Sequence, residues 1–547
     1  MLRVLNIRTA VPMKKPLEAL VAKKLRCSRS DISGLTIVRR SIDARRKPRI
    51  YFVFTVDVSL TEEERLWKRC RDNKDVRRLT ETPEPEIHPG TQAMAHRPIV
   101  IGTGPSGLAA ALTLAEHGYA PIVFERGCDV DTRTKDVETF WRGGPFKASS
   151  NVQFGEGGAG TFSDGKLTTR VNHPLLRRIL QTFVDAGAPE DILYAYNPHV
   201  GTDVLRRVVK NMRHMIEAHG GEVHFSSCVT AIHRDVDGHV VSVTVNDRDE
   251  YPAELVIMGI GHSARDTYYM LYDQGIALEK KPFAVGVRIE HSQDVIDRAQ
   301  YGCPAADLGL EPADYALVYH SPEGRSCYSF CMCPGGVVVG AASEEGRVVT
   351  NGMSLYRRDS GIANSAVVVN VTADDMGGDS PLAGIEFQRR YEALAYQAGG
   401  SNYHAPAQTV GSFLGRPGAP EEGPIHSYRP GVTWTDLHRV LPEFVTTTLA
   451  QALPYFGRRI HGFDDDDVVM TGVETRTSAP VRIVRGDDRV ALDAGGLYPI
   501  GEGAGYAGGI MSAFLDGLET AIEIIRKYQP LEEIGRASCR ERVFRAV

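Results

Sequence analysis

The sequence is most constrained at residues 99–112, where a short apolar run breaks at three glycines and resumes as a series of small residues. The glycines have the spacing Gly102-x-Gly104-x-x-Gly107, which is typical of the turn between a buried parallel strand and the following helix. Gly102 permits the tight turn, Gly104 lets a pyrophosphate approach the backbone, and Gly107 lets the helix pack closely on the strand. The helix N-terminus then offers its N–H groups to the phosphates. The pattern predicts a dinucleotide-binding α/β fold.

A second predicted strand supports this interpretation, because it ends in an acidic residue at a suitable distance. Residues 121–124 read Pro-Ile-Val-Phe, and Glu125 follows them, 18 residues past Gly107. An acid about 20 residues after the glycines can accept hydrogen bonds from ribose hydroxyls and repels a 2′-phosphate. The alternative, a glycine-rich turn in an unrelated sheet, does not explain the combination of strand, helix and acid.

The composition indicates a large globular protein. The chain has 547 residues, of which 42% are hydrophobic and 24% are charged, and it contains no apolar run of about 18 residues that could cross a membrane. Its nine cysteines follow no disulfide framework, and we identify no secretory signal. A cytoplasmic protein is therefore expected.

Changes of pattern along the chain divide it into segments. The alternation of strands and helices stops near residue 282, and strand-like runs replace it. The expected segments are a small α+β domain (1–80), a Pro-rich linker (81–96), a Rossmann-like domain in two parts (97–281 and 471–530), an inserted mixed-sheet substrate domain (282–470) and a tail that is not native (531–547). The expected fold class is thus α/β with α+β parts.

The N-terminal segment is strongly basic. Residues 1–80 hold 21 Lys and Arg against nine Asp and Glu, a balance of +12, in a chain whose net charge is −6. Such a module could bind RNA or an acidic partner. No aromatic recognition motif accompanies the charge, so docking against the acidic remainder of the chain, or a solvated surface, is favoured.

Two further glycine-rich segments are candidates for cofactor contact. Residues 152–166 contain five glycines within eleven positions, and Phe154 and Phe162 would anchor a loop whose backbone a ligand approaches closely. Residues 497–510 are predicted to form a strand, an acidic turn and a glycine loop before an amphipathic helix. That helix offers its positive dipole to an anionic ring edge, and Glu502 offers a carboxylate to a sugar alcohol. Two such sites are hard to explain with NAD alone.

Features of the inserted domain favour structural roles. Cys331 and Cys333 are two positions apart on an expected strand, so their thiols would share a face. A redox pair or a metal site is disfavoured there, because this spacing suits a disulfide poorly and no second Cys/His pair completes a metal set. Both are expected to be core thiols. Residues 334–336, Pro-Gly-Gly, are expected to join strands 327–333 and 337–342 as a hairpin.

These motifs together resemble a known family. The glycine fingerprint with Glu125, the Gly-Glu-Gly turn at 501–503 and the segment 152–166 resemble the FAD-dependent dehydrogenases of the two-dinucleotide-binding-domain flavoprotein superfamily. Residues 501–510, and the run Glu-Thr-Arg-Thr-Ser-x-Pro-Val-Arg at 474–482, are similar to a bacterial group of NAD(P)/FAD-dependent oxidoreductases with a small N-terminal α+β domain. The resemblance covers residues 1–530 and implies a Rossmann-like FAD-binding domain with an inserted substrate domain.

The resemblance implies FAD as cofactor and suggests its contacts. The pyrophosphate would be held by Gly102, Gly104, Pro105, Ser106 and Gly107, and the adenosine half by Glu125, Val229 and Gly261. Glu502 would bind the ribityl chain or the pyrophosphate, and Gly509 and Ile510 would present N–H groups to the flavin. The other cofactor-binding candidates are Arg126, Gly158, Gly160, Thr161 and Gly501. Many members of the superfamily have Asp where this chain has Glu502. Arg476 and Ser478 are the candidates for residues that face the substrate, and no metal is expected.

The leading hypothesis is a FAD-dependent oxidoreductase that moves a hydride or electrons between its flavin and an unidentified small-molecule substrate. No second GxGxxG motif has the required strand, helix and acid, so NAD(P)H is expected to bind transiently, or a redox protein partner supplies the electrons. The alternatives are a flavin-dependent RNA-modifying or RNA-binding protein that uses residues 1–80, a plain NAD-dependent dehydrogenase and a non-enzymatic FAD-stabilised scaffold. Of the possible partners, RNA is not favoured.

Overall fold

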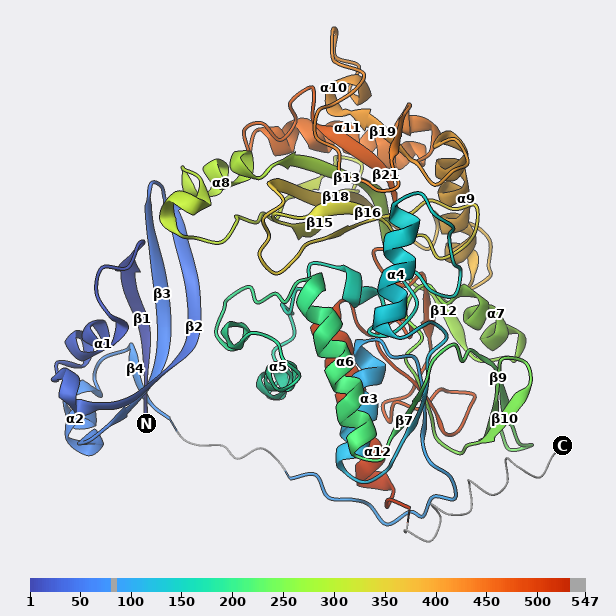
Figure 1. Ribbon diagram of the computed structural model, residues 1–547, viewed down its shortest axis with the longest axis horizontal. Coiled ribbons are helices and arrows are strands. Elements are labelled where there is room, and N and C mark those ends of the chain that lie inside the picture. The colour runs from blue at the N-terminus through green and yellow to red at the C-terminus, as the bar shows by residue number, and fades with distance from the viewer. Residues whose placement is uncertain (80–85, 532–547) are drawn as a thin grey trace.

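The computed structural model describes residues 1–79 and 86–531, so residues 532–547 of the expected tail and part of the expected linker lie outside the described residues. Figure 1 shows a small N-terminal domain beside a body of two lobes, with a mixed sheet in the upper lobe and a parallel sheet with its helices in the lower lobe. The predicted fold class is confirmed. In the part of the chain that is described, no helix is both long enough and apolar enough to cross a membrane.

The N-terminal domain is an antiparallel sheet in the order β2-β3-β1-β4 with two helices. Its elements are β1 (Leu2–Ala10), α1 (Leu17–Leu25), β2 (Ile32–Arg46), β3 (Arg49–Leu60), α2 (Glu63–Cys70) and β4 (Val76–Arg78). Alternate residues of β1 and β3, such as Val4 and Val56, are apolar and pack against Val21 and Leu25 of α1. One face of the sheet therefore forms a small separate core.

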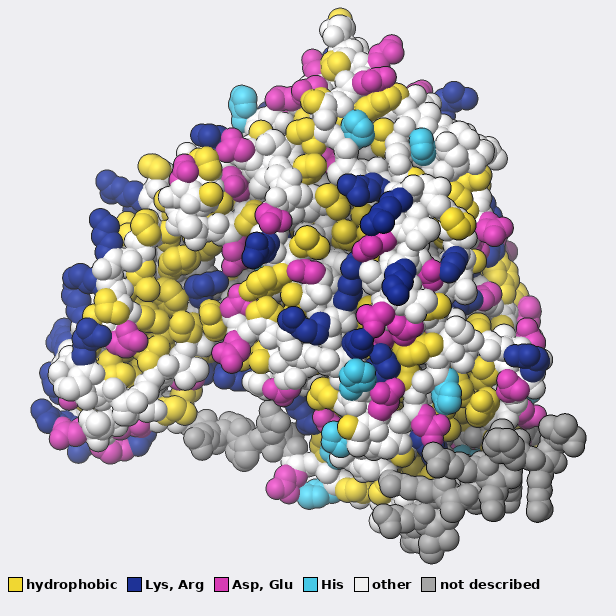
Figure 2. All heavy atoms as spheres, viewed as in Figure 1, with side chains coloured by type: hydrophobic (Ala, Val, Ile, Leu, Met, Phe, Trp, Pro, Cys, Tyr) yellow, Lys and Arg dark blue, Asp and Glu magenta, His cyan; other side chains and the backbone are white. Residues whose placement is uncertain are grey.

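The hairpin of β2 and β3 packs against the body. The backbone N–H of Arg40 donates to the carbonyl of Tyr194 at 2.6 Å, and its guanidinium lies 3.3 Å from Glu311. Ile50 packs into the core of the upper lobe. Figure 2 shows that many other Lys and Arg side chains follow the outer edge of the domain. Part of the basic module is thus docked against the body, and part faces outward.

The lower lobe contains a parallel five-stranded sheet in the order β23-β11-β5-β6-β7. Its strands are β5 (Ile99–Ile101), β6 (Ile122–Phe124), β7 (Glu222–His224), β11 (Val256–Met258) and β23 (Leu497–Pro499). On one face lie α3 (Pro105–Glu116), α6 (Thr202–Ala218) and α12 (Ile510–Lys527), and on the other lies an antiparallel sheet of β8 (Val229–Arg234), β9 (Val240–Val245) and β10 (Asp249–Pro252) (Figure 1).

Close packing of α12 on α3 explains how the C-terminal segment returns to this lobe. A Cβ atom on Gly517 of α12 would lie 2.0 Å from the carbonyl oxygen of Ser106 in α3, so only glycine fits there. The two helices share an apolar core in which Leu108 and Phe514 are buried. The middle of α12 is therefore packed against the start of α3.

The upper lobe is a seven-stranded sheet in the order β14-β15-β18-β13-β21-β19-β20, in which only the β19–β20 pair is parallel. Its strands are β13 (Phe283–Ser292), β14 (Val318–His320), β15 (Ser326–Cys333), β18 (Ile362–Val371), β19 (Ala405–Thr409), β20 (Val432–Trp434) and β21 (Val469–Glu474), and its larger helices are α8 (Gln293–Tyr301), α9 (Ala383–Ala398) and α11 (Glu443–Gly457). The expected boundary between residues 470 and 471 falls inside β21.

Several shorter elements connect the lobes or cover them. They are α4 (Val130–Trp141), α5 (Leu176–Asp185), α7 (Arg265–Asp273), α10 (Val410–Phe413), and the strand pairs β12 (Leu278–Lys280) with β22 (Val481–Ile483) and β16 (Val337–Gly340) with β17 (Thr350–Met353). The chain crosses between the lobes after β12 and again before β22. The segment between β21 and β22 therefore lies at the junction of the lobes.

The predicted hairpin at residues 334–336 is wrong, because β16 pairs with β17, whereas β15 pairs with β14 and β18. The turn sends the chain away from β15. The N–H of Gly336 donates to the carbonyl of Ile362 at 2.9 Å, and Gly335 has a φ of +52° and lies against the backbone of Arg358. Contacts with distant segments, rather than the local Pro-Gly-Gly sequence, thus set the direction of the chain.

The buried carboxyl of Glu290 in β13 leads to a prediction about pH. Glu290 is 1% exposed, and burial raises its pKa to about 7 although Ser427 and Arg288 favour the ionised form. An acid whose pKa is raised by folding contributes stability below its unfolded value, near 4.5, and loses that contribution as the pH rises to about 7. We expect wild type to lose about 3 kcal/mol at this group between about pH 5 and about pH 8, and Glu290→Gln to lose less over that interval.

Urea unfolding at the two pH values checks this expectation. Glu345→Gln is the matched control, because Glu345 is exposed on the same lobe. Equal pH dependence in wild type and Glu290→Gln would contradict it.

Candidate functional site

A cavity lies between the two lobes. At one end it is lined by residues that follow the carboxyl ends of β5, β6 and β11, namely Gly102, Glu125 and Gly259. At the other end it reaches Cys331 and Glu474 of the upper lobe. Ligands of open parallel sheets bind beyond the carboxyl ends of the strands, so the cavity has the position expected of a cofactor site.

The three glycines of the turn after β5 have different surroundings. Two of them are needed for close backbone packing, and the third faces the cavity. A Cβ on Gly107 would lie 1.9 Å from the carbonyl oxygen of Gly102, and one on Gly102 would lie 2.4 Å from that of Gly259. At Gly104 a Cβ would meet only the Cα of Gly158, at 4.0 Å. Gly104 precedes α3 and has no side chain to cap the helix. The start of α3 thus faces open space, which suits an anion.

The carboxylate of Glu125 accepts hydrogen bonds from three loops around the cavity. Its Oε2 accepts hydrogen bonds from the N–H and the hydroxyl of Thr103 at 2.9 and 2.7 Å. Its Oε1 accepts from the N–H groups of Gly127 and Gly155 at 2.9 and 3.0 Å. These four donors already match the about four acceptor sites of a carboxylate, so a ribose hydroxyl would have to share a site with one of them. The structure therefore adds an organising role that the motif did not predict.

The glycine-rich loop 152–166 is ordered by a buried arginine that sequence reasoning missed. Arg133 of α4 is fully buried and donates to the carbonyls of Asn151, Val152, Gly155 and Glu156 at 2.7–3.1 Å. Desolvation lowers the pKa of this guanidinium to about 10. No local motif distinguishes Arg133 from a solvent-exposed helix residue. Its contacts order residues 151–156, and the N–H of Gly157 then donates to the carbonyl of Thr103 at 3.0 Å, in the turn before α3.

The structure brings most of the implied cofactor residues to this one cavity. Those that line it are Gly102, Gly104, Pro105, Ser106, Glu125, Arg126, Gly158, Gly160, Val229, Gly261, Glu502, Gly509 and Ile510, together with the substrate candidate Arg476. Those that do not line it are Gly107, Thr161, Gly501 and Ser478.

The residues outside the cavity have structural contacts of their own. The Thr161 hydroxyl donates to the carbonyl of Glu156 at 3.2 Å, and the N–H of Gly501 donates to Asp516 at 2.7 Å. The Ser478 hydroxyl accepts from Lys281 Nζ at 2.6 Å. Ser478 is thus withdrawn from the position in which it would face a substrate.

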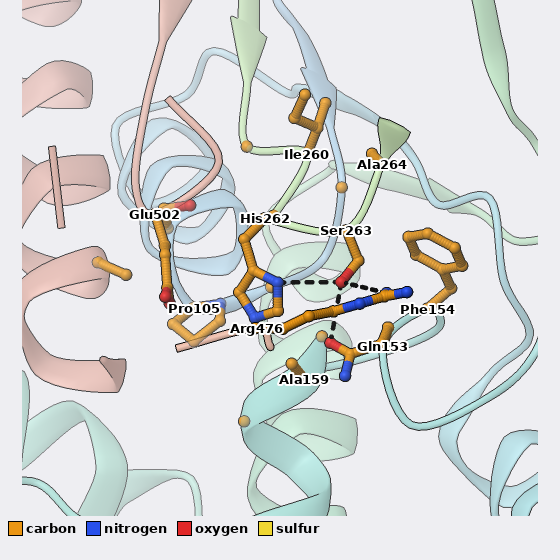
Figure 3. Close-up of a pocket in the computed structure, with 18 of the residues that line it drawn as sticks. Pro105, Gln153, Phe154, Ala159, Ile260, His262, Ser263, Ala264, Arg476 and Glu502 are labelled. Atoms are coloured by element: carbon orange, nitrogen blue, oxygen red, sulfur yellow. Dashed lines mark hydrogen bonds between the residues drawn. The ribbon is translucent and has the colours of Figure 1, made fainter. Parts of the chain in front are cut away.

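Arg476 belongs to a polar network on the cavity wall (Figure 3). Its Nη1 donates to Ser263 Oγ at 2.9 Å, and this hydroxyl lies 2.9 Å from His262 Nδ1 and 3.3 Å from Gln153 Oε1. Burial and the positive charge of Arg476 lower the pKa of His262 to about 3. His262 is therefore neutral at physiological pH and can serve as a hydrogen-bonding group.

Glu392 of α9 supports this network from behind. It is fully buried, and it accepts from Arg476 at 3.1 and 3.0 Å and from Arg265 at 2.7 and 2.9 Å. The two guanidinium groups hold the pKa of Glu392 well below its usual range despite burial. Arg265 has a second acidic partner, Glu344. The cluster fixes Arg476 at the junction of the lobes.

The opposite wall combines an acid with the start of a helix. Burial raises the pKa of Glu502 to about 7, and the nearby Lys281 opposes this shift. Gly509, with a φ of +115°, precedes α12, and a Cβ on Gly508 or Gly509 would meet no atom within 4 Å. The backbone of this turn is therefore open to a ligand, beside a carboxyl group that titrates near neutral pH.

Cys331 lines the cavity, so the expectation of a core thiol is wrong at this position, whereas Cys333 is buried. The strand pattern suggested equivalent side chains, but β15 is irregular between Phe330 and Cys333. Within the described ranges, no three or more His, Cys, Asp and Glu side chains are grouped to hold a metal ion.

Comparison with known proteins identifies similar sequences. The profile "FAD-dependent protein, C-terminal domain-like" matches residues 282–477, "NAD(P)-binding Rossmann-like domain" matches 100–155, and "Flavin containing amine oxidoreductase" matches 144–276. Residues 1–59 match a domain of unknown function. A protein of Clostridium beijerinckii, described as an uncharacterized protein, is 49% identical over 515 residues, which cover 94% of this chain and 96% of the relative.

Solved structures give weaker matches. The glycine oxidase of Bacillus cereus is 11% identical, with 78% of this chain and 95% of that chain covered and a TM-score of 0.35. A geranylgeranyl bacteriochlorophyll reductase-like protein of Thermoplasma acidophilum is 13% identical, with coverages of 83% and 84% and a TM-score of 0.35.

Proposed function

Because the chain belongs to the FAD-dependent oxidoreductase family, we propose that it binds FAD in the cavity between the lobes and oxidises or reduces a small molecule there. The resemblance predicted from the motifs, the cofactor FAD and the oxidoreductase class are confirmed by the family matches. The location of the cofactor, the substrate and the transfer of a hydride or electrons are the proposal.

The observation that carries the proposal is the continuity of one cavity from the glycine turn of the lower lobe to the polar wall of the upper lobe. The backbones at Gly104 and Gly158 face each other so closely that a Cβ on Gly158 would lie 3.0 Å from the Cα of Gly104. This contact closes one side of a cradle whose other side is the uncapped start of α3, and the open N–H groups there fit a pyrophosphate. The open turn before α12 fits a flavin ring edge at the other end.

FAD supplies a ring that takes up or releases two electrons, as a hydride or singly. The N–H groups at Gly509 and Ile510 would stabilise negative charge on this ring, aided by the dipole of α12. Arg476, with its charge balanced by Glu392, would orient an acceptor group of the substrate through Ser263. Glu502 can hold or release a proton near neutral pH.

The proposal also includes a cytoplasmic location and an electron donor that binds transiently, either NAD(P)H or a redox protein. The cysteines of the described ranges are free thiols, which supports a reducing compartment.

The absorption spectrum of the purified protein tests the proposed function. After FAD has been added and the unbound FAD has been removed, we expect a flavin absorption band at about 450 nm. Anaerobic NADH or NADPH should bleach the band if a diffusing nicotinamide is the donor, and a persistent band would indicate a protein donor. A protein that retains no flavin after reconstitution would contradict the proposal.

A further inference from the structure

The strand β15 contains an irregularity at the point where it reaches the cavity. Phe330 lies opposite Ala366 of β18 and Cys333 lies opposite Asn364, so Cys331 and Met332 together face the single residue between them. Cys331 has a φ of +45°, which is uncommon for a residue other than glycine. This is the geometry of a β-bulge, which inserts one residue and bends the strand.

The bulge changes the relation between the two cysteines. On a regular strand, side chains two positions apart stand in parallel on one face and are poorly placed for a disulfide. Here Cys333 turns back, and its Sγ lies 3.3 Å from the carbonyl oxygen of Cys331. Cys331 lines the cavity and Cys333 is buried behind it. The pair therefore has one member open to a ligand and one shielded from it.

Charged groups around the pair favour a thiolate at Cys331. Arg288 Nη1 donates to the Cys331 carbonyl at 2.8 Å, and Lys166 Nζ donates to the carbonyl of Met332. The acids nearby are already paired, Glu474 with Arg288 at 2.9 Å and Asp164 with Arg358.

These surroundings shift the pKa values of the two thiols in opposite directions. The interaction with Cys333, together with Arg288 and Lys166, lowers the pKa of Cys331, although burial and Asp164 oppose the shift. The pKa of Cys333 is raised well above that of an ordinary thiol by burial and by the thiolate beside it. This environment thus favours the thiolate at Cys331 and the protonated thiol at Cys333.

We propose that Cys331 and Cys333 are a redox-active pair that exchanges two electrons with the FAD, and that the substrates of the site are thiols or disulfides that react at Cys331. This inference rests on the proposed location of FAD in the cavity. In one direction, the S–H bond of Cys333 breaks and an S–S bond forms between the two sulfurs. The two electrons and the proton pass to the flavin, which becomes the singly protonated reduced form. An external dithiol then restores the pair by thiol–disulfide exchange.

The first test uses the protein without FAD, so that it does not depend on the cofactor. Iodoacetamide alkylation of Cys331, followed by mass spectrometry across pH, should give an apparent pKa well below about 8.5, the ordinary value for cysteine. Oxidation by a small disulfide should link Cys331 to Cys333, and chymotryptic cleavage after Phe330 separates this pair from Cys327. An ordinary alkylation profile, or oxidation without this link, would overturn the proposal.

The second test uses the FAD-loaded protein under anaerobic conditions with dithiothreitol as the dithiol. We expect Cys331→Ser and Cys333→Ser to bleach the flavin at least about tenfold more slowly than wild type. Cys303→Ser is the matched control, because Cys303 is half-buried and does not line the cavity. Unchanged rates in the first two variants, with FAD retained, would overturn the cysteine pair alone. A failure of every variant and of wild type to retain FAD would instead overturn the proposed function, and with it the electron-transfer step.

Discussion

Replacing Glu392 by glutamine is expected to destabilise the protein by about 3–5 kcal/mol, the cost of leaving a buried charge without its partner. Glu392 is fully buried and is the acceptor for both Arg265 and Arg476. Arg265 keeps a second acidic partner in Glu344, whereas Arg476 has Glu392 as its acidic partner among the ion pairs of the described residues. The lost stability should therefore come mainly from Arg476, which would be left as a buried charge at the junction of the lobes.

Urea unfolding of wild type and Glu392→Gln measures this difference in the free energy of unfolding. Glu386→Gln is the matched control, because Glu386 lies on the same helix α9, is exposed and pairs with Arg389 at the surface. Exposed ion pairs are worth about 1 kcal/mol or less, so the control should resemble wild type. A Glu392→Gln variant as stable as Glu386→Gln would show that the network does not depend on this carboxylate.

The same group makes the protein sensitive to acid. The folded-state pKa of Glu392 lies well below its ordinary value of 4.5. Its ionised form thus contributes stability above about pH 4.5, and this contribution is lost as the pH falls. Glu392→Gln should therefore unfold with a weaker dependence on acid than wild type does over that range.

The elements that the sequence predicted best are those that a local pattern determines. The glycine turn before α3, the acid after β6 and the amphipathic helix α12 each combine a short motif with a clear hydrophobic period, and each lies where the pattern indicated. Burial explains this agreement, because α3 must pack against both β5 and α12 and tolerates only small residues at that contact.

The features that sequence reasoning missed depend on partners that are distant in the chain. Arg133 is a loop organiser only because α4 packs beside residues 151–156, and nothing near it in sequence reveals that contact. The bulge at Cys331 arises from the register between β15 and β18. A period-two strand pattern predicts that Cys331 and Cys333 share one environment, and the bulge gives them two.

The three glycines of the turn before α3 should differ in what their replacement does. Gly104→Ala is expected to weaken FAD binding about 10- to 100-fold while leaving the stability of the FAD-free protein near that of wild type. The added Cβ meets only the Cα of Gly158 at 4.0 Å, so the fold has room for it. It would project into the proposed pyrophosphate cradle, where overpacking costs about 1–3 kcal/mol and each 1.4 kcal/mol is about a tenfold change in affinity.

Gly107→Ala is the comparison variant, because it should lower the stability of the FAD-free protein, whereas Gly104→Ala should lower only the affinity for FAD. Its Cβ would lie 1.9 Å from the carbonyl oxygen of Gly102, so the helix and the turn would have to move apart, and the FAD-free protein should lose stability. Flavin fluorescence titration and urea unfolding of both variants give the two quantities. If Gly104→Ala binds FAD as tightly as wild type, the pyrophosphate does not approach this glycine and the cofactor must lie elsewhere. If Gly104→Ala is instead as unstable as Gly107→Ala, the turn is a folding element at both positions and its geometry carries no information about the ligand.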